Sequence, residues 1–437
     1  MKFKTKWSEI LLRTALVIAV FISIVLSAYI WTSDQRFAHI EPQADRTTSL
    51  KGRDIKSLHD IYMPTQVFRF RDDQLYQVYD VNKNLPLEFS KEIEAADLSH
   101  PVKIAGGRKR YQRFLTNHDL LQLVYPDQLS FAIFYGDLTR DKSVVFNRIF
   151  IPVKTKQTFY LGDDLHDRLY RVKASKLSFD RLMRYSAKST GQIPVRLEWL
   201  RDGYVPFYGK SQKVNVYSYL VNQQPNSYFV SRLLGTSGIT KRVERNSTTY
   251  TAGIYERVTV PKNGSSFEYT NYSINKIPKT LTNRLYDSLT YVHQIGLMEQ
   301  DLRFFDTNGS SVTYRHFVEG FPVFMSPQQN AQIRIAYNAN GMTINFNSID
   351  LQIPIPFDGQ TTSLPATRTV ISDLETEGIA PSDIQLLTIG YRVKYDNTYH
   401  RLINLIPTYY IKIFNHWKSL AEWQSTDITA LKMVAKE

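Results

Sequence analysis

One apolar run dominates the pattern of hydrophobic and polar positions along the chain. From Thr14 to Ser33 there are twenty residues without a charged side chain. A helix of about 20 apolar residues is long enough to cross the roughly 30 Å hydrocarbon core of a bilayer. The sequence therefore predicts a transmembrane helix over residues 14–33.

The charges before this run predict its orientation. Residues 1–13 carry four Lys or Arg side chains and a single acidic residue, Glu9. Positive charge is retained on the cytoplasmic side of a membrane. We therefore expect residues 1–13 to be a cytoplasmic tail of a single-pass protein in the cell membrane, with all later residues extracytoplasmic.

A cleaved secretory signal is the alternative interpretation of this segment. A signal has an apolar region of about 7–15 residues that ends in small residues at a cleavage site. Val25 and Ser27 would form a weak site, but the apolar run continues through Tyr29, Ile30 and Trp31. Tyr and Trp favour the interface at the membrane surface, so a retained span is the preferred interpretation.

Small side chains recur at every fourth position of the predicted span. They are Ala15, Ala19, Ser23 and Ser27. Such a stripe lets a second membrane helix approach closely, and serine hydroxyls can add hydrogen bonds between helices. The stripe is our candidate helix–helix interface; its alternative explanation is chance, because Ala and Ser are common in membrane spans.

Beyond the span, the pattern changes from a polar segment to alternating, strand-like stretches. Residues 34–54 are polar without periodicity and predict a tether. Helices are expected at 87–98, 177–187 with Ser178 as N-cap, 227–234, 281–295 and 368–377. Strands are expected at 66–70, 75–81, 119–124, 129–135, 144–153, 248–260, 267–273, 302–306, 312–318, 333–338, 342–346, 384–395 and 401–413.

These elements predict an α+β fold with three strand-rich extracytoplasmic domains, at 55–192, 193–280 and 281–437. In each of the last two, a helix precedes strands joined at an Asn-Gly-Ser-Ser turn, at 263–266 and 308–311. Asn-Gly favours type I′ hairpin turns, and Asn340-Gly341 is a third example. The two domains are expected to be similar, although turn geometry alone could select the repeated tetrapeptide.

Composition narrows the possible functions. The 437 residues include 13% aromatic residues and no cysteine, so disulfides, thiolate zinc sites, iron–sulfur clusters and cysteine nucleophiles are excluded. The formal net charge is +13. Basic clusters at 108–113 and 168–176 could contact an anionic lipid or envelope polymer, although a solvated basic face is the simpler explanation. The predicted topology argues against nucleic acid as a partner.

The common catalytic and nucleotide-binding motifs are missing from the sequence. Asp163, Asp164, His166 and Asp167 could hold a divalent cation, but a surface turn with aspartate caps is the preferred explanation. The stretch 235–238 looks like a serine-nucleophile turn, yet it follows a helix whose C-cap its glycine would provide. We therefore expect no catalytic, cofactor-binding or metal-binding residues and no enzyme activity.

Several segments together resemble one known family. They are the basic tail, the span that ends in Ile30-Trp31, the YMPTQVF motif at 62–68 and the closing hairpin LLTIGYRVKYDNTYHRLINLIPTYYIKIFNHWKSL at 386–420. This architecture is similar to that of the YycH family of two-component regulatory proteins from Gram-positive bacteria. The resemblance implies three outer domains, the last two alike, and a non-enzymatic role.

The resemblance also implies partners. Members of the family associate through their membrane helices with a YycI-like sister protein and with an essential, cell-wall-controlling sensor histidine kinase of the YycG/WalK type. We therefore expect a membrane-anchored accessory regulator of that kinase. A passive envelope scaffold or wall-polymer binder is the first alternative, and a membrane-anchored cell-wall hydrolase is the second.

Overall fold

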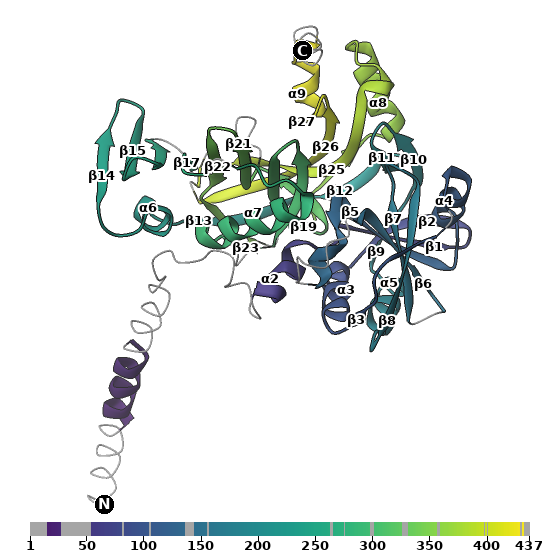
Figure 1. The fold of residues 1–437 in the computed structure, drawn as a ribbon, viewed down its shortest axis with the longest axis horizontal. Helices are drawn as coiled ribbons and strands as arrows, with labels where there is room; N and C mark the ends of the chain where they lie inside the picture. Colours follow the sequence, from purple (N-terminus) through teal and green to yellow (C-terminus); the bar gives the residue numbers. More distant parts are fainter. Residues whose placement is uncertain are drawn as a thin grey trace, which may run out of the picture. The chain divides into compact units, whose positions relative to one another are not determined.

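The computed structural model describes residues 15–27 and 54–431 (Figure 1). Within the second range it does not describe 81–82, 105, 136–143, 155–156, 263–264, 275, 298–300, 326–330, 356–358, 397, 400 and 429–430. The chain divides into two units, Met1–Arg53 and Asp54–Glu437. Each unit is taken by itself below.

The first unit contains a helix at residues 15–27, and every side chain in this helix is exposed. Among the described residues, no helix combines the length and the apolarity that crossing a membrane requires. Position 14 and positions 28–33 of the expected span lie outside the described residues, as do the expected cytoplasmic tail and most of the tether. The tether's last residue, Asp54, instead begins helix α2.

An antiparallel sheet of nine described strands forms the N-terminal part of the second unit, in the order β3-β8-β7-β6-β5-β1-β2-β9 with β4 paired to β8. The strands are β1 Gln66–Arg71, β2 Gln74–Tyr79, β3 Asp97–Leu98, β4 Val102–Ile104, β5 Leu120–Ser130, β6 Val145–Pro152, β7 Thr158–Asp163, β8 Arg168–Ser175 and β9 Gly191–Pro194. The helices are α2 Asp54–Ile61, α3 Leu85–Glu94, α4 Arg108–Leu115 and α5 Asp180–Ala187.

Local sequence explains how helices pack on this sheet. Asn84 caps α3 by accepting a hydrogen bond from the Leu87 backbone N–H, and Pro86 occupies the first turn, where a missing N–H costs nothing. The buried face of α3 presents Phe89, whose ring stacks on Phe179 with centroids 5.9 Å apart. Phe179 immediately precedes α5, so this contact joins the two helices.

A second sheet of fourteen described strands forms most of the remainder, with the main path β14-β15-β16-β17-β22-β21-β19-β20-β25-β26-β13-β23. Its strands are β13 Tyr217–Gln223, β14 Ile239–Val243, β15 Ser247–Ala252, β16 Glu256–Pro261, β17 Ser266–Asn271, β18 Leu302–Asn308, β19 Ser311–Val318, β20 Phe321–Phe324, β21 Ile333–Asn338, β22 Gly341–Asn347, β23 Ile349–Ile355, β25 Ile384–Tyr395, β26 Leu402–Ile413 and β27 His416–Ser419. Two short pairs complete the strands, β10 Arg196–Leu200 with β11 Gly203–Phe207 and β12 Gln212–Asn215 with β24 Thr361–Leu364.

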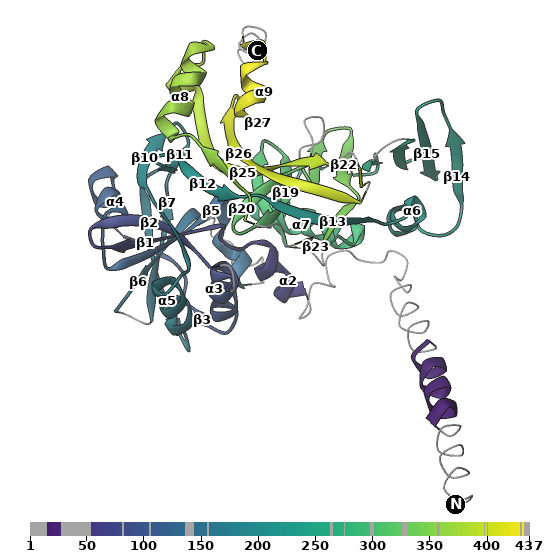
Figure 2. The same ribbon diagram turned by 180° about the vertical axis from the view of Figure 1, so that it is seen from behind.

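Four helices accompany the second sheet: α6 Asn226–Leu234, α7 Leu281–Ile295, α8 Thr367–Thr376 and α9 Leu420–Gln424. The long β25–β26 hairpin, yellow in Figures 1 and 2, runs through the middle of this part of the molecule. Strands β14 and β15 project from its far end in both views.

A single buried cluster connects the two sheets. It includes Phe68 and Val124 from the N-terminal sheet together with Val323, Tyr391 and Leu405 from the second sheet. Because the same apolar core continues from one sheet to the other, contact between them is part of the fold of the second unit. The proposed division at 192/193 and 280/281 stays a prediction; β17 pairs with β22 across the latter boundary.

Several expected elements differ from those observed. The two strands expected at 119–124 and 129–135 are one strand, β5, with a register shift between Val124 and Leu129, followed by a 3-10 turn at Phe131–Tyr135. The single strand expected at 248–260 is the hairpin β15–β16, which turns at Gly253 with φ +59°. The N-cap of α5 is Phe179 rather than Ser178.

The hairpins expected at Asn308-Gly309 and Asn340-Gly341 are confirmed, but their turns are not type I′. A type I′ turn needs positive φ at both central residues. Asn308 pairs with Ser311, so Gly309 and Ser310 are the central residues; Gly309 has φ +57°, but Ser310 is not at positive φ. In the other hairpin Asn338 pairs with Gly341, so the two central positions come earlier than expected. The turn at 263–264 lies outside the described residues.

Candidate functional site

The small-residue stripe is helical in the structure. Ala15, Ala19, Ser23 and Ser27 all lie in the helix at 15–27, and all four are exposed. Positions four apart share one face of a helix, so the four side chains form the continuous stripe that the sequence suggests. Exposed apolar residues such as Leu16 and Phe21, at 66% and 68%, flank it. Whether a second helix packs there stays a prediction.

The residues at 163–167 form the expected turn, but its first two aspartates are not on the surface. They follow β7 and lead into β8, so a turn is present, but Asp163 and Asp164 are only 2% and 1% exposed. No group of three or more His, Cys, Asp or Glu side chains suited to a metal occurs in the part of the chain that the structure describes. His166 Nδ1 lies 2.8 Å from Asp163, whose other oxygen accepts a bond from Gln128 at 2.9 Å.

Asp164 is buried because Arg148 of β6 neutralises it. The Arg148 guanidinium donates to both carboxylate oxygens, from Nε at 2.9 Å and from Nη2 at 2.8 Å. The Tyr111 hydroxyl of α4 also donates to Asp164. Burial alone would lower the pKa of Arg148, but the charge of Asp164 outweighs it and the pKa is raised. The cluster therefore fixes α4 and the β7–β8 turn against the sheet and has a structural role.

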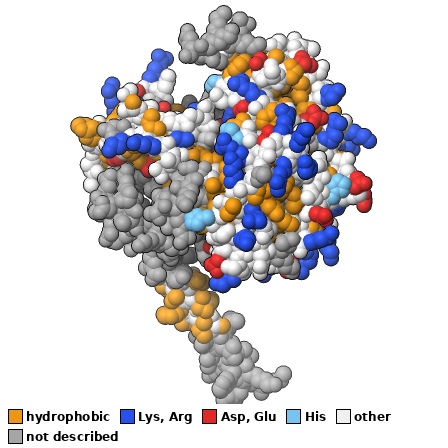
Figure 3. All heavy atoms as spheres, turned by 45° about the vertical axis from the view of Figure 1, so that its right-hand side comes forward, with side chains coloured by type: hydrophobic (Ala, Val, Ile, Leu, Met, Phe, Trp, Pro, Cys, Tyr) orange, Lys and Arg blue, Asp and Glu red, His pale blue; other side chains and the backbone are white. Residues whose placement is uncertain are grey.

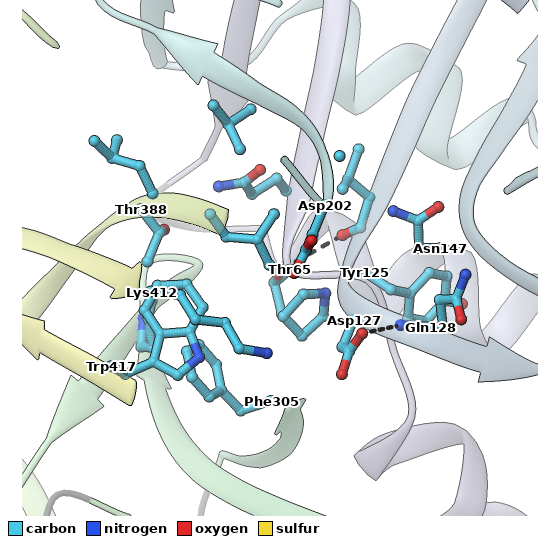
Figure 4. Close-up of a pocket in the computed structure, with 18 of the residues that line it drawn as sticks. Thr65, Tyr125, Asp127, Gln128, Asn147, Asp202, Phe305, Thr388, Lys412 and Trp417 are labelled. Atoms are coloured by element: carbon cyan, nitrogen blue, oxygen red, sulfur yellow. Dashed lines mark hydrogen bonds between the residues drawn. The ribbon is translucent and has the colours of Figure 1, made fainter. Parts of the chain in front are cut away.

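A cavity of about 230 Å³ lies where the N-terminal sheet meets the second sheet (Figure 4). Tyr125 and Asp127 of β5 contribute to its wall from one side, and Phe305, Lys412 and Trp417 from the other. The close-up shows these side chains converging from different strands, with Trp417 and Phe305 forming an aromatic wall. Residues far apart in the sequence therefore meet at one place, which we call the seam cavity.

Buried charges join the two sheets beside the seam cavity. Asp127 Oδ2 accepts two hydrogen bonds from Thr307 of β18, from its backbone N–H and from its hydroxyl, both at 2.7 Å. Lys412 of β26 donates to Asp306 at 2.7 Å, and both side chains are less than a tenth exposed. Burial, followed by the charge of Asp306, raises the pKa of Asp127. The half-buried carboxylate of Asp127 thus lies beside the buried ion pair of Asp306 and Lys412.

One polar group in the wall of the seam cavity lacks a partner. The Tyr125 hydroxyl is buried and makes no hydrogen bond to any residue that the structure describes. Burial raises its pKa well above the usual value of tyrosine, so the hydroxyl stays protonated. No nucleophile–base pair accompanies it among the described lining residues.

The basic clusters are found on exposed surfaces. Arg108, Lys109, Arg110 and Arg113 lie on the exposed face of α4, whose opposite face buries Tyr111. Figure 3 shows Lys and Arg side chains spread widely over one face, with fewer acidic ones between them. This distribution agrees with a solvated basic face. Gly235 follows α6 as its C-cap, as expected for the 235–238 stretch.

Sequence reasoning missed the seam cavity and the Arg148 cluster. Their members come from strands separated by tens to hundreds of residues; Asp127 and Thr307 are 180 residues apart. The one local signal was an arginine and a glutamine, Arg148 and Gln122, at inward positions of otherwise apolar strands. A charge at a buried strand position requires a partner.

Comparison with known proteins identifies the family. The description "YycH protein, N-terminal domain" matches residues 11–188, and "YycH protein, C-terminal domain" matches residues 201–426. The chain belongs to the YycH family. No match was found among curated proteins. A solved structure, the crystal structure of YycH from Bacillus subtilis, is similar with a TM-score of 0.68 and 15% identity, covering 83% of this chain and 96% of that chain.

Membership in the YycH family bears on both the fold and the function of the protein. The structural likeness confirms the strand-rich α+β fold. The YycH family consists of membrane-associated regulators, not enzymes, and membership implies regulation of the YycG sensor kinase system.

Proposed function

We propose that the protein is a membrane-anchored accessory regulator that modulates an essential, cell-wall-controlling sensor histidine kinase. The observation that carries the proposal is the match of both YycH descriptions, which together extend over most of the chain. In this proposal residues 14–33 span the membrane, residues 1–13 are cytoplasmic and the strand-rich unit is extracytoplasmic. A YycI-like sister protein acts together with it on the kinase.

The regulator works through helix packing in the membrane and contacts outside it. A regulator shifts a kinase between conformational states only if it binds those states with different affinities. The stripe of Ala15, Ala19, Ser23 and Ser27 supports the membrane contact, because it exposes a row of small side chains along one helix face. The large exposed surface of the strand-rich unit offers the second contact.

Two alternatives remain weaker. A membrane-anchored hydrolase needs a cleft with converging catalytic groups, and the seam cavity offers no such set among its described residues. A passive envelope scaffold would act equally well from any anchor. Replacing the span by an unrelated one therefore distinguishes the regulator from the scaffold.

The experiment changes the stripe while keeping the helix. Ala19→Leu with Ser23→Leu should preserve insertion and abundance but weaken association about three- to thirtyfold, because packing and polar contacts between membrane helices contribute about 0.6–2 kcal/mol each. The matched control is Val20→Leu with Ile24→Leu on the neighbouring face. The readouts are crosslinking to the kinase or sister protein, and a reporter of a kinase-controlled promoter.

The control decides how the result is interpreted. Equal effects from both pairs would reject the stripe as the interface, and no effect from either would move the contact to the outer unit. Failure to recover the kinase or the sister protein with the wild-type protein from detergent-solubilised membranes would contradict the proposed function itself.

A further inference from the structure

The second sheet has one broad face that nothing described so far uses. It belongs to six consecutive strands, β14-β15-β16-β17-β22-β21. Over β17 and β22 the other face is covered: the ring of Phe229 in α6 lies 4.9 Å from Phe267 and 5.2 Å from Phe346, measured between centroids. Successive side chains of a strand point to opposite faces, so the residues between these apolar positions form a second, outward surface.

The strand register arranges this outward surface in two rows that cross all six strands. The first row is Arg242, Thr249, Thr259, Glu268, Asn345 and Arg334. The second row is Thr240, Thr251, Arg257, Thr270, Thr343 and Ala336. Neighbouring strands are about 4.8 Å apart, so each row is about 24 Å long. We call these twelve residues the threonine–arginine face.

The threonine–arginine face is rich in hydrogen-bonding groups and carries positive charge. Six of its residues are threonine, of which Thr270 is only 5% exposed, and the largest wholly apolar side chain in the two rows is that of Ala336. The exposed cations Arg242, Arg257 and Arg334 stand against one carboxylate in the rows, that of Glu268. Arg242 also has an ion pair at 3.4 Å with Glu244 in the adjacent turn.

The spacing of the cations suits an elongated anion. Arg242 and Arg334 lie at opposite ends of the first row, and Arg257 lies on the third strand between them. Beside Arg257 the surface is hollowed by about 440 Å³, and Asn338, Asn340 and Tyr272 contribute to the wall of the hollow. Arg257 lies over the Tyr272 ring at 5.4 Å, which holds its guanidinium at the rim.

We propose that the threonine–arginine face binds an extended polymer of phosphodiester-linked polyols. Guanidinium groups bind phosphate through paired hydrogen bonds, and rows of hydroxyls bind both phosphate oxygens and polyol hydroxyls. The twelve residues of the face include no large apolar side chain to insert among acyl chains, so a polymer rather than a bilayer surface is the ligand. This inference does not depend on the proposed kinase regulation.

The test measures binding of fluorescent poly(glycerol phosphate) to the full-length protein in nanodiscs of zwitterionic lipid, by anisotropy over a series of salt concentrations. Arg257→Gln with Arg334→Gln should weaken binding about twenty-fivefold, from about fivefold for each exposed charge, and should reduce the salt dependence. The control removes two exposed cations that lie outside the two rows, Lys241 on β14 and Lys262 just after β16: Lys241→Gln with Lys262→Gln should change affinity less than about twofold.

Further arms distinguish the possible outcomes. Thr249→Glu adds a carboxylate in the middle of the first row and should weaken binding even if the arginine pair reduces thermal stability. Equal losses from the arginine pair and the lysine pair would show general electrostatic attraction and overturn the proposal. Equal binding of polyglutamate would also overturn it, as would binding only to nanodiscs containing anionic lipid. Loss of polymer binding with normal kinase regulation would separate the two functions.

Discussion

At the scale of single residues, the clearest feature is the number of charged and polar side chains buried with partners. Arg148 is fully buried with Asp164, whereas the ion pair of Lys154 and Asp119 is 82% and 67% exposed. A buried charge that loses its partner costs far more than an exposed one, because water cannot replace the missing contact. The two pairs therefore have different energetic roles within one sheet.

Removing Arg148 tests this difference. We expect Arg148→Met to lower the free energy of unfolding by about 3–5 kcal/mol, because it leaves the Asp164 carboxylate buried without its cation. Lys154→Met is the control and should cost no more than about 1 kcal/mol. Arg148→Met combined with Asp164→Leu should cost less than the sum of the single changes. Urea unfolding measures all four values, and strictly additive losses would contradict the pairing.

A buried histidine predicts how stability depends on pH. Burial lowers the pKa of His316 to about 4, with a smaller opposing effect from Asp301. Between pH 6.5 and 4 the unfolded chain therefore binds a proton at this residue that the folded chain does not. The stability contribution of neutral His316 is fully present above pH 6.5 and is lost as the pH falls towards 4.

The matching variant keeps a planar aromatic ring and removes the titration. His316→Phe should flatten the fall in unfolding free energy between pH 6.5 and 4, by up to about 3 kcal/mol for a shift of this size. Thermal unfolding across that pH range, for wild type and variant, gives the two slopes. Parallel slopes would show that another group governs the acid response; buried His59, whose pKa burial also lowers to about 4, is the next candidate.

At the scale of elements, the sequence predicts those that are defined locally. Helix α7 matches its expected range because Thr280 caps it and Gly296 ends it in the left-handed conformation. The hairpin of β25 and β26 follows from alternation around a short turn. Pairings such as β13 with β23 and the parallel β20 with β25 were not predicted, because strands distant in sequence carry no local signal of their partner.

Gly296 shows that one glycine can have both a conformational and a packing role. Its φ is +83°, and a Cβ there would lie 2.6 Å from the Tyr228 hydroxyl and 2.7 Å from Arg232 Nε. Arg232 of α6 donates to the carbonyl oxygens of His293 and Gln294 at the end of α7. A side chain at position 296 would therefore displace the contact that joins α6 to α7.

A second glycine supplies the control for this prediction. Gly378 has φ +81°, and a Cβ there would have no heavy atom within 4 Å. Both Gly378→Ala and Gly296→Ala incur the backbone penalty of about 1 kcal/mol for alanine at positive φ. Gly296→Ala should cost about 1–3 kcal/mol more, because Tyr228 and Arg232 must move. Equal melting temperatures for the two variants would contradict a packing role for Gly296.

At the scale of the whole molecule, the second unit depends on its seam. The candidate site there was not predictable, because nothing in the sequences of β5 and β18 shows that Asp127 and Thr307 will meet. By contrast, the helical stripe could be read directly from residues 15–27, since four-residue spacing in a helix defines a face without any tertiary contact. Local signals therefore reveal surfaces, whereas enclosed sites require the three-dimensional pairing of strands.

Asp127 is the residue with which to test the seam, because both of its hydrogen bonds from Thr307 cross from one sheet to the other. Asp127→Ala should lower the free energy of unfolding by about 1–3 kcal/mol, since the part-buried backbone N–H and hydroxyl of Thr307 lose a charged acceptor. Asp119→Ala, which removes a 67% exposed carboxylate just before the same strand, should cost under about 1 kcal/mol.

Because the continuous core joins the sheets, wild type should unfold in one transition, whereas Asp127→Ala should broaden or split that transition. Unfolding is followed separately by tryptophan fluorescence, to which Trp417 beside the seam contributes as one of five tryptophans, and by far-ultraviolet circular dichroism. Coincident, unshifted curves for the variant would show that the two sheets are held together elsewhere.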